Sequence, residues 1–145
     1  MLKHFTEKKL RRRLAQLEGL TFVFICIDDG PSKKVLVDFL ISKGIPFVDC
    51  GMGVEATENA LGGLVRATTV TASKNDHVQK RIGFSEAEED DYSQNVQIAE
   101  LNALNAALAV IKWKKLAGFY KDSENEHNVV YDLEINKLLN DEARA

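Results

Sequence analysis

The chain has few of the residues that mark specialised classes of protein. Among its 145 residues are only two cysteines, Cys26 and Cys50, and they form no CxxC pair. This argues against a zinc site or a disulfide framework and favours buried free thiols in a reducing compartment. No apolar run approaches the roughly 18 residues of a membrane span, and the N-terminus lacks the apolar core of a signal peptide. We therefore expect a cytoplasmic protein without a membrane partner.

Excess charge of one sign is also missing. The net charge is -3, so no overall basic field indicates a nucleic-acid partner. Lysine and arginine do gather in residues 1–13, and acids in residues 85–91, and both runs are typical of solvated faces. The basic run lacks interleaved aromatics, which argues against a nucleic-acid arm.

Phosphate-binding loops are absent as well. The sequence has no GxGxxG after a strand and no GxxxxGK[ST], so it presents no nucleotide cradle of its own. The short Gly51-Met52-Gly53 run follows an apolar segment and predicts a tight turn there.

One run is informative. Six apolar residues, 22–27, end in Asp28 and Asp29, and Gly30-Pro31 then opens a helix. Because the run does not alternate, it predicts a strand buried on both faces. Acids at the carboxyl end of such a strand lie where open α/β folds bind ligands, and Asp28 suits a magnesium ion. Capping of the following helix by either aspartate is the alternative.

The remaining pattern predicts an α/β fold: a partial Rossmann-like sheet with mixed edge strands, one βαβ crossover and a long C-terminal helix. A helix ending at Lys43-Gly44 joins the first strand to a second at residues 45–50, so the two are parallel. We expect further elements as follows: a basic N-terminal helix or arm within 1–19, a strand at 62–71, a long loop at 72–91, a helix at 92–117 capped by Ser93, a strand at 128–135 and a frayed tail at 136–145.

Other side chains allow more than one interpretation. Cys50 stands at a strand end, as a nucleophile would, but the spacing pairs it with neither His77 nor His127. We predict a buried structural thiol and two surface histidines. Arg66, in an apolar segment, either binds an anion or pairs with an acid. Asparagines in the long helix, such as Asn105, predict a solvated face.

Four segments together resemble a known family. They are residues 22–28, the strand at 45–48, the Gly62-Gly63-Leu64-Val65 segment and the helix at 97–112. In order and spacing, residues 20–135 resemble the C-terminal half of the ThiF/MoeB/HesA family, whose fold is shared with ubiquitin-activating enzymes. The resemblance implies a half-domain over 20–135.

The resemblance also implies a reaction. Family members use ATP and magnesium to adenylate the C-terminal carboxylate of a ubiquitin-like or sulfur-carrier protein ending in Gly-Gly. Asp28 matches the family's magnesium-associated aspartate, and Asp29 stands beside it where the family often has asparagine. The resemblance therefore assigns both to cofactor binding and Asp28 to the metal, and it assigns no catalytic residue.

The family's glycine-rich nucleotide loop lies in an N-terminal half that residues 1–19 are too short to replace, and its CxxC zinc pairs are also missing. We therefore expect a truncated or split module, inactive alone, that binds a ubiquitin-like tail or completes a site with a separate N-terminal half or another subunit. We also predict that it self-associates. Two alternatives stay open: a complete small adenylyltransferase acting as a homo-oligomer, and a purely structural or interaction domain.

Overall fold

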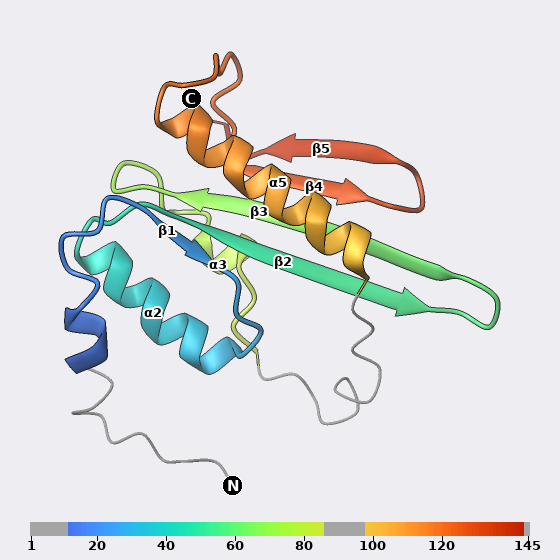
Figure 1. The fold of residues 1–145 in the computed structure, drawn as a ribbon, viewed down its shortest axis with the longest axis horizontal. Coiled ribbons are helices and arrows are strands. Elements are labelled where there is room, and N and C mark those ends of the chain that lie inside the picture. Colours follow the sequence, from blue (N-terminus) through green and yellow to red (C-terminus); the bar gives the residue numbers. More distant parts are fainter. Residues whose placement is uncertain (1–11, 86–97, 144–145) are drawn as a thin grey trace, which may run out of the picture.

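A mixed five-stranded sheet organises the chain (Figure 1). The computed structural model describes residues 12–85 and 98–143. The elements are β1 (Val23–Ile25), α2 (Gly30–Ser42), β2 (Phe47–Ala56), β3 (Leu61–Val70), α3 (Val78–Arg81), α5 (Ala99–Leu116), β4 (Asn128–Asp132) and β5 (Lys137–Asp141). The strands lie in the order β1-β2-β3-β4-β5; β1 and β2 are parallel, and the other neighbours are antiparallel. The predicted α/β class, with its single parallel crossover and long helix, is confirmed.

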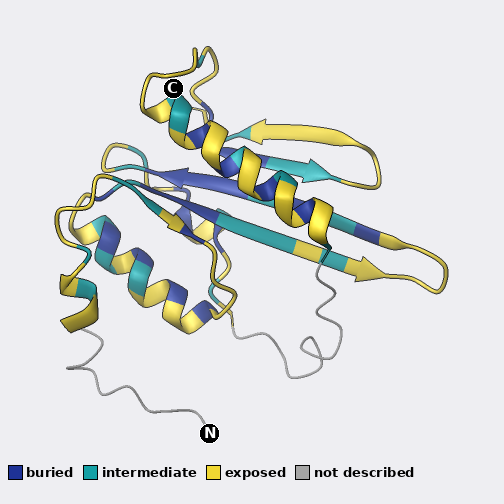
Figure 2. Cartoon of the chain, viewed as in Figure 1, coloured by how far each residue is buried: buried dark blue, intermediate teal, exposed yellow. Residues whose placement is uncertain are grey.

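The two long helices cover opposite faces of the sheet. Side chains alternate along β2, so Phe47 packs in the cluster beneath α2 while Val48 packs in the cluster beneath α5. The first cluster includes Val37 and Leu40 of α2, and the second includes Ala109 of α5. Figure 2 shows the buried residues of both helices on the sides that face the sheet.

The helix ends follow the sequence signals. Helix α2 begins after Asp29, and Gly44 lies past its end with φ 66°. Gly118, with φ 75°, likewise follows α5. These positive φ angles suit glycine and confirm both predicted stops. Ser93, the predicted cap of the long helix, lies outside the described residues.

Strand β1 differs from its prediction. It has three residues and lies at the edge of the sheet, where Phe24 is 43% exposed. Ile27, just beyond it, is 38% exposed. The prediction of burial on both faces is wrong because β1 has one neighbouring strand among the described residues, and the two helices cover it only in part.

The predicted turn at Gly51-Met52-Gly53 is also wrong. Strand β2 continues through these residues to Ala56 and pairs with β3 along its whole length. The turn comes later, where Thr57 donates both its backbone N–H and its hydroxyl to the carbonyl of Ala60. Exposure rises toward this turn (Figure 2), which explains the polar sequence there.

The ends of the chain and the long loop hold more structure than expected. Residues 137–141 form β5, so the predicted frayed tail is wrong there; backbone pairing with β4 stabilises a strand whose side chains are mostly exposed. Helix α3 interrupts the predicted loop at 72–91, of which 86–91 lie outside the described residues. Residues 12–15 of the predicted N-terminal helix are helical.

No helix among the described residues is both long enough and apolar enough to cross a membrane.

A buried charge cluster fixes the C-terminal end of α5 to the segment that leads into β4. Lys112 donates to the backbone carbonyl of Glu126 at 2.7 Å and pairs with its carboxylate at 3.1 Å. Lys115 reaches the same carboxylate at 3.0 Å. Burial acts to raise the pKa of Glu126, but the hydrogen bonds from Lys115 and Lys112 outweigh it and lower that pKa to about 2.

This cluster predicts a loss of stability in acid. Because the folded pKa of Glu126 lies below its ordinary value of 4.5, the ionised carboxylate stabilises the fold above that pH, and the stabilisation disappears as the pH falls toward 2. We expect Glu126→Gln to destabilise the protein at neutral pH, with the difference from wild type shrinking over this interval in urea titrations. Glu124→Gln, at an exposed position nearby, is the control; a constant difference at every pH would contradict the assignment.

Candidate functional site

The two adjacent aspartates have different environments. Asp29 caps α2, because its Oδ2 accepts a hydrogen bond from the backbone N–H of Ser32 at 2.9 Å. Hydrogen bonds from Ser32 hold the pKa of Asp29 below its ordinary value. Asp28 is exposed and borders an open pocket of about 480 Å³, a size that holds a small ligand. The structure thus assigns the cap to Asp29 and leaves Asp28 at the pocket.

This division predicts unequal stability effects. Asp29→Ala should lower the free energy of unfolding by about 1 kcal/mol, the usual effect of losing an N-cap. Asp28→Ala should change it by less than about 0.5 kcal/mol, as for other surface substitutions. Denaturant titration of the two variants side by side checks this; equal losses would contradict the assignment of the cap to Asp29 alone.

A buried ion network forms one wall of the pocket. Asp49 of β2 is fully buried and lies between two cations, Lys33 Nζ at 3.3 Å and Arg66 Nη2 at 2.6 Å. Lys33 comes from the first turns of α2 and Arg66 from β3, so the network joins three elements. Arg66 thus pairs with an acid, one of its two predicted roles. Both cations also border the pocket.

Gly51 makes room for this network. A Cβ at this position would lie 2.6 Å from Nη2 of Arg66, which is too close for any side chain unless the guanidinium moved. Arg66 also donates to Thr68, whose hydroxyl donates to Asn128 Oδ1 at 2.6 Å. The glycine that suggested a turn in the sequence therefore serves the packing of an arginine across neighbouring strands.

Loss of Asp49 should be costly. Asp49→Ala leaves the buried ammonium of Lys33 without its partner, and we expect a loss of roughly 3–5 kcal/mol in the free energy of unfolding. Asp38→Ala is the matched control because the Asp38–Lys34 pair is exposed, and its loss should cost at most about 1 kcal/mol. Similar losses in the two variants, measured by urea unfolding, would contradict the structural importance of the buried network.

Residues of α5 form the wall of a second hollow beside β2. Asn105 is buried and donates from Nδ2 to the carbonyl of Gly51 at 2.9 Å, so the predicted solvated face is wrong at this position. Its Oδ1 is buried and has no hydrogen-bond partner among the described residues. The hollow is bordered by Cys26, Asp28, Cys50, Met52, Asn102, Asn105 and Ala106. In this hollow, Oδ1 of Asn105 can accept a hydrogen bond from an N–H group of a ligand.

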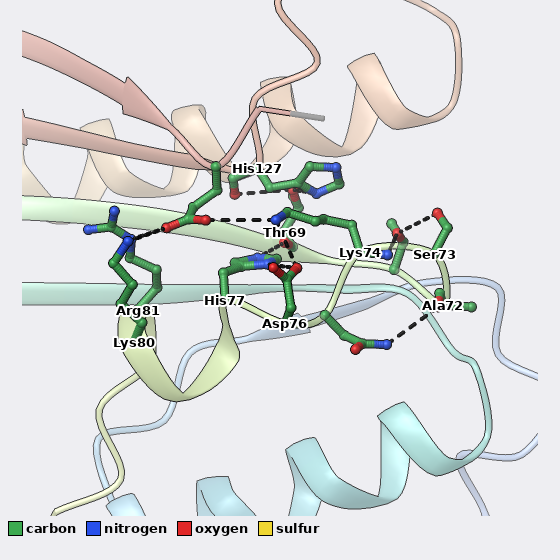
Figure 3. A network of polar contacts seen from close by, with 12 residues as sticks. Thr69, Ala72, Ser73, Lys74, Asp76, His77, Lys80, Arg81 and His127 are labelled. Atoms are coloured by element: carbon green, nitrogen blue, oxygen red, sulfur yellow. Dashed lines mark hydrogen bonds and ion pairs between the residues drawn. The ribbon is translucent and has the colours of Figure 1, made fainter. Parts of the chain in front are cut away.

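The structure does not bring Cys50 and the histidines together as a nucleophile and its base. Burial, and next the neighbouring Cys26 thiol, raise the pKa of Cys50 to about 12. His77 Nε2 lies 2.9 Å from the carbonyl of Thr69, and His127 Nδ1 lies 3.1 Å from its hydroxyl (Figure 3). Neither histidine borders the pockets that hold Cys50.

Both histidines are buried, so the prediction of surface positions is wrong. Their rings pack 5.7 Å apart beside Thr69, with His77 directly before α3 and His127 directly before β4 (Figure 3). Cys26 is exposed and Cys50 half-buried, so the expectation of two buried thiols is also wrong for Cys26.

Sequence reasoning missed Lys33, Asp49 and Asn105. The first left a detectable signal: Lys33, Val37 and Leu40 have helical spacing and share the buried stripe of α2. Asn105 stood out as an asparagine inside a helix and was interpreted as part of a solvated face, and Asp49 gave no signal because its partners are distant in the sequence.

No protein-family model and no curated protein matches this chain. Within residues 12–85 and 98–143, no three His, Cys, Asp or Glu side chains come together as a metal site. Asp28 could still supply one carboxylate to magnesium, which commonly takes one or two protein carboxylates and completes its shell with phosphate oxygens and water.

Proposed function

We propose that this chain is a ThiF-like half-domain that binds the extended C-terminal tail of a ubiquitin-like or sulfur-carrier partner. In this proposal it completes an adenylation site only together with a glycine-rich nucleotide-binding half, in the same polypeptide or in another subunit. The observation that carries the proposal is an exposed apolar edge strand that leads directly to Asp28.

The edge of β1 supports docking of another element. Phe24 and Ile27 are exposed in a run that a parallel sheet ordinarily buries. Phe22, Phe24 and Trp113 form an aromatic cluster beside the edge. The ring centroid of Phe24 lies 5.2 Å from that of Phe22 and 5.9 Å from that of Trp113. Exposed edges of this kind readily pair with another strand. The same edge is also the surface through which we propose that copies of the chain self-associate.

The neighbouring strand supports binding of an extended peptide. Strand β1 pairs with β2 only at Phe47, Val48 and Asp49, whereas β2 continues to Ala56 (Figure 1). On the side away from β3, the residues from Gly51 onward have no partner strand within the described residues. A peptide tail can add to such an edge through main-chain hydrogen bonds. The acceptor of Asn105 offers a further partner for its N–H groups.

The charges at this site suit the proposed reaction. Lys33 and Arg66 lie at the pocket wall with two carboxylates, Asp49 between them and Asp28 at the border of the same pocket. The two cations would attract a tail carboxylate to their side of the pocket, and Asp28 would attract a cation. In the family reaction the tail carboxylate attacks the α-phosphate of ATP and pyrophosphate leaves. Magnesium, when bound, would neutralise phosphate charge. Asp28 would contribute a ligand oxygen to it.

Calorimetric titration of the chain tests this proposal with two probes, a peptide ending in Gly-Gly and magnesium-ATP. We expect the peptide to bind and magnesium-ATP alone to give no micromolar binding. Gly53→Val should abolish peptide binding, because Gly53 borders the pocket and a valine side chain would obstruct it. The fold should tolerate the change, since a Cβ at Gly53 would meet only the Leu64 side chain, no closer than 3.9 Å. Glu58→Val, in the hairpin turn, is the matched control.

The other outcomes identify the competing functions. Micromolar magnesium-ATP binding that disappears in Asp28→Ala would establish a self-sufficient adenylyltransferase. Binding of neither probe would overturn the proposal in favour of a structural or interaction domain.

A further inference from the structure

The two cysteines of the chain lie where β1 ends beside β2. The last register pair of β1 and β2 is Ile25 with Asp49; Cys50 is the next residue of β2, and Cys26 directly follows the end of β1. Parallel strands lie about 4.8 Å apart, within the roughly 4.4–6.8 Å between Cα atoms that a disulfide spans.

Their side chains also share a face of the sheet. Phe47 packs beneath α2, so the alternation of β2 directs Cys50 to the opposite face, where it packs against the cluster beneath α5. Cys26 borders the hollow on that same side. Both thiols border the hollow that contains Asp28 and Asn105. The neighbouring Cys26 thiol is also among the groups that raise the pKa of Cys50. Position, orientation and proximity thus agree for the pair.

We propose that Cys26 and Cys50 are a redox pair, which a peroxide oxidises to a reversible cross-strand disulfide at the floor of the Asp28 hollow. This pair does not depend on the proposed function.

The two thiols have distinct roles. Cys26 is exposed and meets the oxidant first: its sulfur takes one oxygen from hydrogen peroxide, giving a sulfenic acid and one water. The half-buried Cys50 then attacks that sulfur, the S–O bond breaks, and a second water leaves as the disulfide forms. Each sulfur has lost one electron, and both thiol protons end in water. A dithiol reductant reverses the reaction by exchange.

The environment of Cys50 supports this order. Burial, and next the neighbouring Cys26, raise the pKa of Cys50 to about 12, so Cys50 is a poor first target for peroxide. It gives up its thiol proton only as it attacks the sulfenic acid, and that proton leaves in the second water. The disulfide would tie the carboxyl end of the edge strand to β2, two residues before Asp28. Oxidation would therefore fix the backbone that presents this aspartate to the pocket.

The test is mass spectrometry of the native chain after treatment with hydrogen peroxide. Because the chain has only two cysteines, an intramolecular disulfide can join only Cys26 to Cys50. We expect a monomer that has lost two hydrogens and both alkylatable thiols, and that dithiothreitol restores. Retention of both free thiols, disulfide-linked dimers only, or sulfinic acid as the sole product would each overturn the proposal.

Single variants test the assigned order. In Cys50→Ser the sulfenic acid on Cys26 should persist and be trapped by dimedone, whereas in Cys26→Ser the remaining Cys50 should stay unmodified under the same treatment. Dimedone labelling of Cys50 at an equal or greater rate would overturn the assignment. Should Cys50→Ser fail to fold, Cys50→Ala suits the apolar surroundings formed by Val48 and Ala67 and provides the same readout.

Discussion

The buried contact of Asp49 with Lys33 and Arg66 is the constraint on which the architecture around the pocket depends. A fully buried carboxylate is tolerated only when cations and hydrogen-bond donors replace its water. Here those groups come from α2 and β3, so the charge can be satisfied only when helix, strand and hairpin are in register. The network therefore specifies how the parallel unit meets the antiparallel part of the sheet, and Gly51 leaves the space that the guanidinium of Arg66 occupies.

The sheet that this network organises has two edges that expose apolar side chains. At β5, Leu138 and Leu139 are 55% and 51% exposed. At β1, the apolar run around Phe24 reaches the surface beside an aromatic cluster. The same hydrophobic driving force that buries such runs elsewhere acts here toward association. The β1 edge and the Asp28 pocket are continuous, since Asp28 follows the run directly.

Local signals in the sequence predicted the elements that depend on local chemistry. Gly44 and Gly118 end helices through their backbone freedom, and the proline after Asp29 marks the start of α2, so these boundaries could be read directly. The burial of a segment could not be predicted in this way, because it depends on which other segments pack against it. The apolar run of β1 lies at an edge of the sheet, with a single neighbouring strand among the described residues.

Side chains whose environment is made by distant segments were the other failure. His77 and His127 are 50 residues apart in the sequence, yet both hydrogen-bond to Thr69 in the folded chain. The polar sequence around each histidine indicated a surface position, and nothing in it indicated that the two histidines pack together. Asp49 and Asn105 were missed for the same reason. The sequence predicted a candidate site at Asp28, which follows a strand directly. It did not predict the network around Asp49, whose members come from three separate elements.

The adjacent aspartates show how the core and the surface of the site are coupled. Asp29 fixes the first turn of α2 through Ser32, and Lys33 follows in that same turn, where it enters the core to meet Asp49. The cap thereby positions the buried cation, and the cation in turn secures the helix start against the sheet. Asp28 takes part in neither contact, and because neighbouring residues point in different directions it remains at the pocket. One acid of the pair is thus committed to the helix cap, and the other stays exposed at the pocket.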